Sequence, residues 1–250
     1  MKYCIFSKKI SLKTKIKNRC QNKINYFYFV NGYFFIFLQN HQQKLYFYSG
    51  DKLFFLTLKV MINLAIFVSG SGTNCESLIR HFENSEKFRV ALVVSNKSDA
   101  YALIRAKNHN IPTSVMPKAK LNSSKEFMPL MTMYGIQFIV LAGFLPLVPD
   151  YLIEAYPNRI VNLHPALLPK YGGKGMWGHH VHEAVKASGE TETGMTVHYV
   201  SAICDGGEII VQHTCSISPE ETAEDIAAKE HELEMKYYAK DIEDILLRTF

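Results

Sequence analysis

From residue 61 onward the chain alternates short apolar runs with amphipathic stretches, and the two patterns predict strands and helices in turn. Strands are expected at 62–69, 90–95, 113–116, 136–142 and 160–164. Helices are expected between them at 73–82, 100–109, 124–133 and 150–156. The run 136–142 is apolar at nearly every position, which is typical of a strand buried on both faces. The alternation predicts a parallel sheet joined by right-handed crossovers.

The pattern changes after residue 182. Two further strand patterns, at 196–200 and 208–212, flank Asp205-Gly206-Gly207 and predict antiparallel strands at the sheet edge. An amphipathic stretch over roughly 223–247 predicts a long closing helix. We therefore expect an α/β fold with a doubly wound, mostly parallel sheet, an antiparallel edge and a long C-terminal helix.

Residues 1–60 have a different composition from the rest of the chain. They contain eleven Lys and Arg against one acid, a net charge of +10, and neither proline nor alanine. Their apolar run at 26–38 is shorter than the roughly 20 residues of a spanning helix, and no small-residue cleavage site follows it. We expect 1–60 to be a leader that is disordered or outside the functional protein, with a targeting peptide as the alternative, and 61–250 to be the catalytic domain.

Charge and cysteine content restrict the partners of the larger part. Residues 61–250 carry seventeen bases and twenty-two acids, a net charge of −5, which does not favour a nucleic-acid or membrane surface. The five cysteines are widely spaced and form no C-x-x-C pair, so neither a disulfide framework nor a zinc site is expected. These features predict a cytoplasmic protein, with an organelle as the alternative, and small-molecule partners.

A glycine-rich loop, Ser69-Gly70-Ser71-Gly72-Thr73-Asn74, joins the first strand to the first helix. Glycines permit a tight turn, and the free amides of a helix N-terminus favour phosphate. The dinucleotide fingerprint is incomplete because Cys75 and Glu76 stand near the place of its third glycine, and the P-loop lysine is missing. The loop predicts a small phosphorylated ligand, with a plain β-α turn as the alternative.

Asn162 and His164 end the strand at 160–164, two residues apart and hence on the same face of the sheet. Pro165 donates no ladder hydrogen bond, so pairing should end there. An amide beside an imidazole at a strand end can hold an oxyanion and move a proton. The alternative is a buried strand end whose polar groups satisfy loop backbone.

Four segments together resemble the folate-dependent formyltransferases. They are Ser69–Asn74, Leu141–Phe144, Asn162–Pro169 and Asp205–Gly207. The resemblance extends from Met61 to about Leu247. It implies transfer of the formyl group of 10-formyltetrahydrofolate, a co-substrate, to the amine of glycinamide ribonucleotide in purine biosynthesis. It implies no metal and is compatible with a monomer or a homodimer.

The resemblance also implies roles for individual residues. Asn162 and His164 would stabilise the tetrahedral oxyanion, with His164 as general acid and Asp205 close to it. The chemistry agrees, because placed donors lower the barrier to an oxyanion and a carboxylate favours the protonated imidazole.

Further residues match the ligand-binding positions of the family. Gly72, Thr73 and Asn74 match the loop for the substrate phosphate, and Glu234 matches a glutamate that engages the glycinamide end. On the residues alone, the alternative for Glu234 is one more solvated acid on a charged helix face that includes Glu230 and Glu232. The folate positions match Lys125, Leu145, Pro146, Leu147, Val148 and Asn162. Two of these depart from common members, which place an arginine at 125 and often a basic residue at 146. Proline offers no backbone donor, and lysine lacks the bidentate fork of arginine.

The segment 170–182 is rich in glycine and is expected to be a mobile, substrate-proximal lid followed by a helix. Its histidines at 179, 180 and 182 have no carboxylate or cysteine that completes a metal site. His198 and Tyr199 are expected to be ordinary strand residues.

Three other functions remain possible on this sequence. Formyltetrahydrofolate deformylase uses the same three catalytic residues but carries a regulatory domain, for which 1–60 is too short and poorly patterned. Methionyl-tRNA formyltransferase has a second domain and an Arg-Gly run after the position of Pro169, which this chain lacks. A non-catalytic nucleotide- or folate-binding module would not need Asn162, His164 and Asp205 together.

The status of residues 1–60 is directly testable. The pattern from Met61, which passes straight into a strand, predicts that the native protein begins there. Peptide mapping of the N-terminus of the native protein should therefore start at Met61. Any native peptide from within residues 1–60 contradicts this expectation.

Overall fold

The chain divides into two units, Met1–Val60 and Met61–Phe250. The computed structural model describes residues 24–30, 33–38, 44–49, 52–57 and 61–250, the first four stretches by their backbone only. Those stretches form a four-stranded antiparallel sheet, β1 (Ile24–Val30), β2 (Tyr33–Leu38), β3 (Lys44–Ser49) and β4 (Lys52–Thr57), paired in sequence order. The other residues of 1–60 lie outside the described set, and the assignment of 1–60 as a leader stays a prediction.

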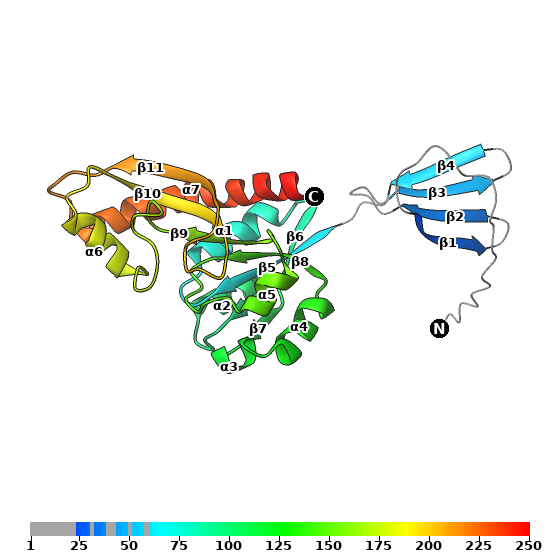
Figure 1. The fold of residues 1–250 in the computed structure, drawn as a ribbon, viewed down its shortest axis with the longest axis horizontal. Helices are drawn as coiled ribbons and strands as arrows, with labels where there is room; N and C mark the ends of the chain where they lie inside the picture. The colour runs from blue at the N-terminus through cyan, green and yellow to red at the C-terminus, as the bar shows by residue number, and fades with distance from the viewer. Residues whose placement is uncertain (1–23, 31–32, 39–43, 50–51, 58–60) are drawn as a thin grey trace. The chain divides into compact units, whose positions relative to one another are not determined.

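The second unit is built on a seven-stranded sheet in the order β11-β10-β9-β8-β5-β6-β7. Its strands are β5 (Ile62–Val68), β6 (Phe88–Ser95), β7 (Thr113–Val115), β8 (Ile136–Leu141), β9 (Ile160–His164), β10 (Glu192–Tyr199) and β11 (Ile209–Ser216). Its helices are α1 (Thr73–Phe82), α2 (Tyr101–Asn108), α3 (Lys118–Leu121), α4 (Ser124–Met133), α5 (Asp150–Ala155), α6 (His179–Ala187) and α7 (Ala223–Thr249). Strands β5 to β9 pair in parallel, and β10 and β11 form the antiparallel edge, so the predicted fold class is confirmed (Figure 1).

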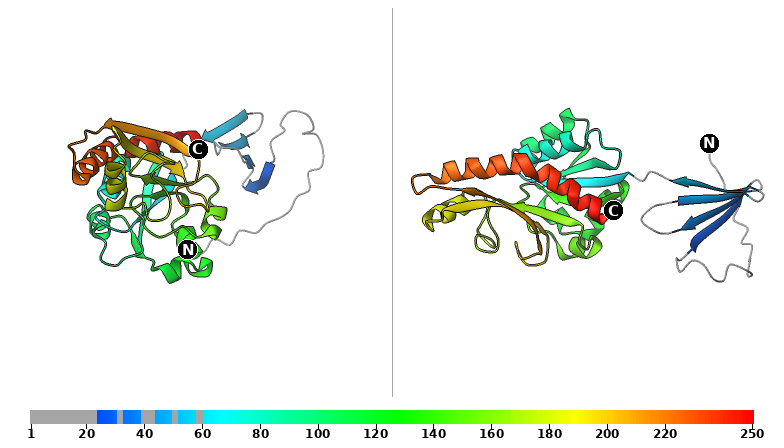
Figure 2. Two further views of the ribbon diagram at one scale, coloured as in Figure 1. Left: turned by 60° about the vertical axis from the view of Figure 1, so that its left-hand side comes forward. Right: turned by 90° about the horizontal axis from the view of Figure 1, so that it is seen from above.

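The direction of winding reverses beside β5. The chain moves from β5 outward to β6 and β7, then returns to place β8 on the other side of β5. Because each crossover is right-handed, the reversal sends the helices to opposite faces of the sheet (Figure 2). The reversal opens a crevice at the carboxyl ends of β5 and β8, where doubly wound sheets bind their ligands.

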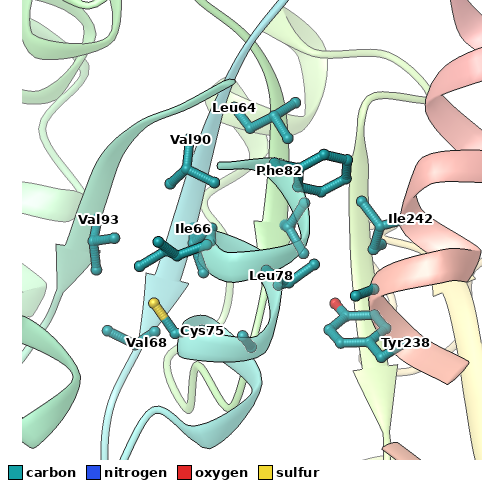
Figure 3. Packing of buried hydrophobic residues seen from close by; sticks show 14 of the residues in the cluster. Leu64, Ile66, Val68, Cys75, Leu78, Phe82, Val90, Val93, Tyr238 and Ile242 are labelled. Atoms are coloured by element: carbon teal, nitrogen blue, oxygen red, sulfur yellow. The ribbon is translucent and has the colours of Figure 1, made fainter. Parts of the chain in front are cut away.

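The two hydrophobic cores follow from the alternation of side chains along β5. Leu64 and Ile66 face the layer that contains α1, α2 and α7, whereas Ala65 and Phe67 face α4 and α5. In the first layer α1 and α7 pack against each other and both lie on the sheet (Figure 3). Tyr238 of α7 is fully buried there, and its hydroxyl donates to the carbonyl of Leu141 at 2.7 Å. This bond ties α7 to the carboxyl end of β8.

Element boundaries differ from the sequence prediction mainly in the last third. β10 begins at Glu192 and β11 ends at Ser216, because the two strands pair antiparallel well beyond the predicted runs. α6 begins at His179, so the histidines assigned to the lid stand in a helix. α7 starts where Thr222 and Asp225 form a reciprocal capping box, which satisfies free amides of the first turn.

One buried polar cluster joins α6 to α7. His182 Nδ1 lies 2.6 Å from Glu230 Oε2, and the Thr193 hydroxyl donates to the other carboxylate oxygen. Glu230 is only 1% exposed, and burial raises the pKa of its carboxyl. The sequence pattern grouped Glu230 with the solvated acids of α7, and that interpretation is wrong because this part of the helix faces α6 and β10.

Loss of the imidazole at position 182 should destabilise the fold. In His182→Ala the Glu230 carboxyl stays buried without its partner, and breaking such a pair costs about 3 kcal/mol. His180→Ala is the matched control, because His180 is exposed and contacts Glu183 on the same helix. Urea denaturation of the full chain should show the loss in His182→Ala only. Equal free energies of unfolding for the two variants would contradict the role of the cluster.

Candidate functional site

Asn162 and His164 stand at the carboxyl end of β9, at the boundary between the parallel and antiparallel parts of the sheet. In the antiparallel register with β10, His164 lies opposite Thr196 and Asn162 lies opposite His198. His164 is 4% exposed and Asn162 is half-buried. The two side chains therefore share one face, as their spacing predicted.

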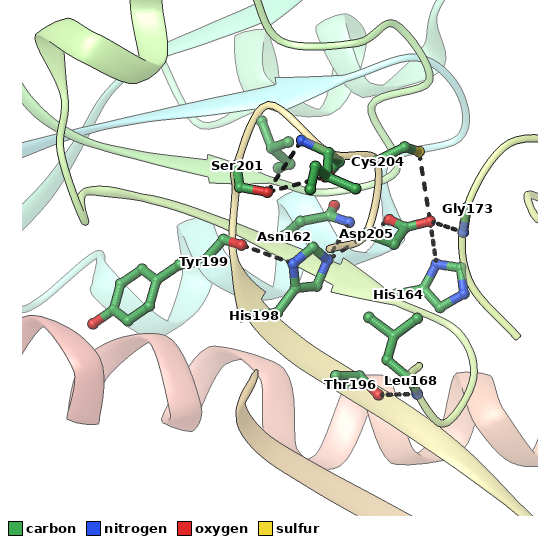
Figure 4. Close-up of polar contacts among 12 residues, drawn as sticks. Asn162, His164, Leu168, Gly173, Thr196, His198, Tyr199, Ser201, Cys204 and Asp205 are labelled. Carbon is green, nitrogen blue, oxygen red and sulfur yellow. Dashed lines mark hydrogen bonds and ion pairs between the residues drawn. The ribbon is translucent and has the colours of Figure 1, made fainter. Parts of the chain in front are cut away.

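His164 is held between a backbone carbonyl and the carboxylate of Asp205, and Figure 4 shows its contact with the carboxylate. Its Nε2 lies 2.6 Å from the carbonyl oxygen of Tyr171, and its Nδ1 lies 3.7 Å from Asp205 Oδ2. A carbonyl oxygen only accepts hydrogen bonds, so Nε2 carries a proton. Nδ1 is then the nitrogen that gains and loses a proton, and it faces the carboxylate.

Asp205 reaches His164 through a strained turn. Its φ of 53° lies in the left-handed region, which Asp tolerates better than most residues. A Cβ at Gly207 would lie 1.7 Å from the carbonyl oxygen of Tyr199, so only glycine fits there. The amide of Gly173 donates to Asp205 Oδ2 at 2.9 Å. The structure thus brings Asp205 to His164, as predicted, and places the start of the expected lid against it.

His198 is a part of the site that the sequence pattern did not identify. Its Nδ1 donates to the carbonyl of Tyr199 at 2.9 Å, which leaves Nε2 to accept from the Asn162 amide at 3.1 Å. Burial lowers the pKa of His198, which keeps the ring neutral and able to accept. Nε2 also lies 3.8 Å from Asp205 Oδ1 (Figure 4). The sequence feature that could have identified His198 is the alternation of polar residues, Thr196 and His198, in an otherwise apolar strand.

The glycine-rich loop ends at Gly72, which precedes α1 with a φ of +75°. Asn74, in the first turn of α1, donates from Nδ2 to Glu234 Oε2 of α7 at 3.0 Å. Its Oδ1 is buried and has no hydrogen-bond partner among the residues the structure describes. The loop and Glu234 were predicted from separate ends of the sequence, and the structure places them next to each other. The oxygen Asn74 Oδ1 remains there as a hydrogen-bond acceptor without a donor among the described residues.

The segment predicted to line the folate pocket follows β8. Leu145 and Leu147 are exposed, while Pro146 and Val148 are half-buried. The amide of Leu145 donates to Ser69 Oγ at 2.9 Å, so this segment is bonded to the end of β5. Apolar side chains exposed next to a loop with fixed backbone are suited to a flat aromatic ligand.

Lys125 stands apart from the other predicted residues. It is exposed in the first turn of α4 and lines a surface hollow of that helix with Met128 and Met133. Within residues 61–250 no hydrogen bond or ion pair joins it to the ends of β8 or β9.

Three further observations describe the surroundings of the site. A cavity of about 710 Å³ lies at the opposite, amino ends of β5 and β6, near Asn63 and Arg89, and contains none of the predicted residues. Across the described residues, no group of three or more His, Cys, Asp or Glu side chains is arranged to hold a metal ion. The helices of that part of the chain are also too short or too polar to span a membrane.

Comparison with known proteins gives consistent matches. The sequence model of the formyl transferase family matches residues 62–242. The chloroplastic phosphoribosylglycinamide formyltransferase of Arabidopsis thaliana is 40% identical over 180 residues, which are 68% of this chain and 62% of that protein. The phosphoribosylglycinamide formyltransferase of Haemophilus influenzae is 34% identical over 183 residues, 71% of this chain and 84% of that protein. The chain thus spans less than two thirds of the plant relative.

A solved structure agrees with these matches. Phosphoribosylglycinamide formyltransferase from Bacillus halodurans superposes with a TM-score of 0.68 at 34% identity, covering 75% of this chain and 97% of that one. The family match spans the whole Rossmann-like sheet and includes Asn162, His164 and Asp205. The chain therefore belongs to the formyl transferase family.

Proposed function

We propose that this protein transfers the formyl group of 10-formyltetrahydrofolate to the amine of glycinamide ribonucleotide, a step of purine biosynthesis. The observation that carries the proposal is the arrangement at the end of β9, where His164 faces Asp205 and Asn162 lies on the same face. The names of the relatives in plants and bacteria support the choice of the acceptor and of the formyl group as the group transferred.

The reaction requires stabilisation of a developing oxyanion. When the amine attacks the formyl carbon, the carbonyl oxygen becomes negative, and donors already in place lower that barrier. The Asn162 amide gives one N–H to His198 and keeps its second N–H for the substrate. Protonated His164 is the second donor, through Nδ1. Both groups come from one rigid strand, which fixes their separation.

His164 then serves as general acid. As the tetrahedral intermediate collapses, the bond between the formyl carbon and the folate nitrogen breaks, and that nitrogen takes the proton from Nδ1. The proton that the new amide nitrogen loses passes to the deprotonated Nδ1 and restores the imidazolium. Asp205 faces Nδ1, so its negative charge attracts the positive charge that the ring carries during the reaction. At 3.7 Å the contact is longer than a hydrogen bond, so the attraction is mainly Coulombic.

The two substrates would be bound by different segments of the chain. Gly72, Thr73 and Asn74 would hold the substrate phosphate at the start of α1, and Glu234 would engage the glycinamide end. The unpaired Asn74 Oδ1 accepts a donor of the ribonucleotide in this arrangement. The segment 145–148, with Asn162, would hold the pterin of the folate, and Lys125 would face its acidic part. No metal takes part.

Two alternative functions are distinguishable from this proposal by their products. A deformylase with the same three residues would release formate without the ribonucleotide, and a binding module would catalyse neither reaction.

The location and the assembly are proposed separately. We propose the cytoplasm as the location, although a relative is named chloroplastic. We keep the monomer and the homodimer as the proposed assemblies.

A direct assay tests the function and the general acid together. The purified protein should form tetrahydrofolate from 10-formyltetrahydrofolate only when glycinamide ribonucleotide is present. His164→Ala should lower kcat about 10²- to 10⁴-fold, the usual contribution of a general acid. His180→Ala is the control and should retain the rate. Turnover without the ribonucleotide indicates a deformylase, no turnover indicates a binding module, and full activity of His164→Ala removes the proposed acid.

The neutral state of His198 predicts a pH-dependent stability. Its pKa in the folded protein lies below the ordinary value of 6.5, so below pH 6.5 the unfolded chain binds more protons. The free energy of unfolding should therefore fall by up to about 1.4 kcal/mol per pH unit from pH 6.5 down to the lowered pKa.

His198→Gln isolates this contribution. Glutamine retains an acceptor for the Asn162 amide but does not titrate, so the variant should show a shallower acid decline than the unchanged protein. Urea denaturation between about pH 7.5 and about pH 5.5 measures the difference, and the other histidines contribute equally to both. Identical slopes for the two proteins would show that His198 is not the group responsible.

A further inference from the structure

The N-terminal turns of α2 lie against the glycine-rich loop and bind two of its carbonyl groups. The amide of Ala102 donates to the carbonyl of Gly70 at 3.1 Å, and Arg105 Nε donates to the carbonyl of Ser71 at 2.9 Å. A Cβ at Gly72 would lie 2.4 Å from the Ala102 side chain, so the loop has no space to move toward α2.

These two bonds determine where the loop amides point. In a trans peptide the carbonyl and the following N–H are directed to opposite sides. Because the carbonyls of Gly70 and Ser71 point to α2, the N–H groups of Ser71 and Gly72 point away from it. Within residues 61–250 neither N–H has a hydrogen-bond acceptor. Two free amides aimed to one side at the start of a helix form a cradle for an anion.

Arg105 is itself anchored from two directions. Its Nη1 forms an ion pair with Glu76 of α1, and its guanidinium lies 5.0 Å from the centre of the Tyr101 ring. Arg80 also pairs with Glu76, and the two arginines hold the pKa of that carboxyl at about 2. Glu76 therefore remains ionised throughout the physiological pH range. The planar guanidinium bonds a carboxylate and a carbonyl at once, which the point charge of lysine does less well.

We propose that Arg105, anchored by Glu76, is a positioning residue for the phosphate monoester of the substrate. It does not touch the phosphate. It fixes the Ser71–Gly72 peptide so that the adjacent amides meet the phosphate without rearrangement when the substrate binds. This inference rests on the proposed function for the identity of the phosphorylated substrate, but its geometric basis is independent of the formyl transfer chemistry.

Kinetics of variants test the proposal. Arg105→Met should raise KM for glycinamide ribonucleotide about tenfold, equivalent to about 1.4 kcal/mol. The kcat value and KM for the folate should change little, because the strand-end residues are not affected. Arg105→Lys should recover part of the loss. Arg80→Ala is the matched control, since Arg80 shares Glu76 but does not bond the loop, and it should leave all constants unchanged.

A binding measurement separates this inference from the proposed function. Titration calorimetry with inorganic phosphate should show weaker binding to Arg105→Met than to the unchanged protein and to Arg80→Ala. If the unchanged protein binds phosphate but transfers no formyl group, the proposed function fails and the phosphate result still decides this inference. Equal phosphate affinity for Arg105→Met and Arg80→Ala overturns it, as does a loss in Arg105→Met that falls on kcat alone. Thermal unfolding of each variant verifies that it is folded.

Discussion

The antiparallel register between β9 and β10 is the constraint on which the candidate site depends. It sets Asn162 opposite His198 and His164 opposite Thr196, where a parallel neighbour would have paired β9 differently. A shift by one residue would turn Asn162 and His164 to the other face of the sheet. From β10 the chain continues into the turn before β11, and this turn returns Asp205 to His164. One register thus aligns an amide, two imidazoles and a carboxylate.

Within that frame, backbone carbonyls decide which nitrogen of each histidine is free. The carbonyl of Tyr171 accepts a hydrogen bond from His164 Nε2, and the carbonyl of Tyr199 accepts one from His198 Nδ1. The two rings are therefore set to opposite tasks. His164 presents Nδ1 to a carboxylate, whereas His198 presents a bare nitrogen to the Asn162 amide. Desolvation lowers the pKa of His198 and keeps this ring neutral.

In the glycine-rich loop, too, the backbone carbonyls and the backbone amides face different partners. The carbonyls of the glycine-rich loop are bound by α2, so its amides are left for a ligand. Glu76 pairs with two arginines, which explain why an acid is tolerated in the first turn of a helix that faces the proposed anion site. The negative charge of Glu76 balances the positive charge of Arg105. Arg105 thereby holds the loop rigid, and the loop itself contains no charged residue that repels phosphate.

Much of the fold and the core of the site followed from local sequence. The spacing of apolar residues predicted the strands and helices of residues 61–250. An element that is buried on one face or on both faces shows a characteristic spacing of apolar residues, and tertiary contacts rarely override it. The spacing of Asn162 and His164 determined their shared face, and Asp205-Gly206-Gly207 marked a turn that only glycine permits. The resemblance carried by these motifs supplied the candidate ligands.

Only the tertiary structure decided which distant residues meet. His198 looked like an ordinary strand residue until β10 paired with β9, and Glu230 looked solvated until α6 packed on α7. Arg105 carries no motif, since its partner is a backbone carbonyl that any sequence would offer. These roles arise from contacts between segments far apart in the chain, and such contacts leave no period or spacing in the local sequence.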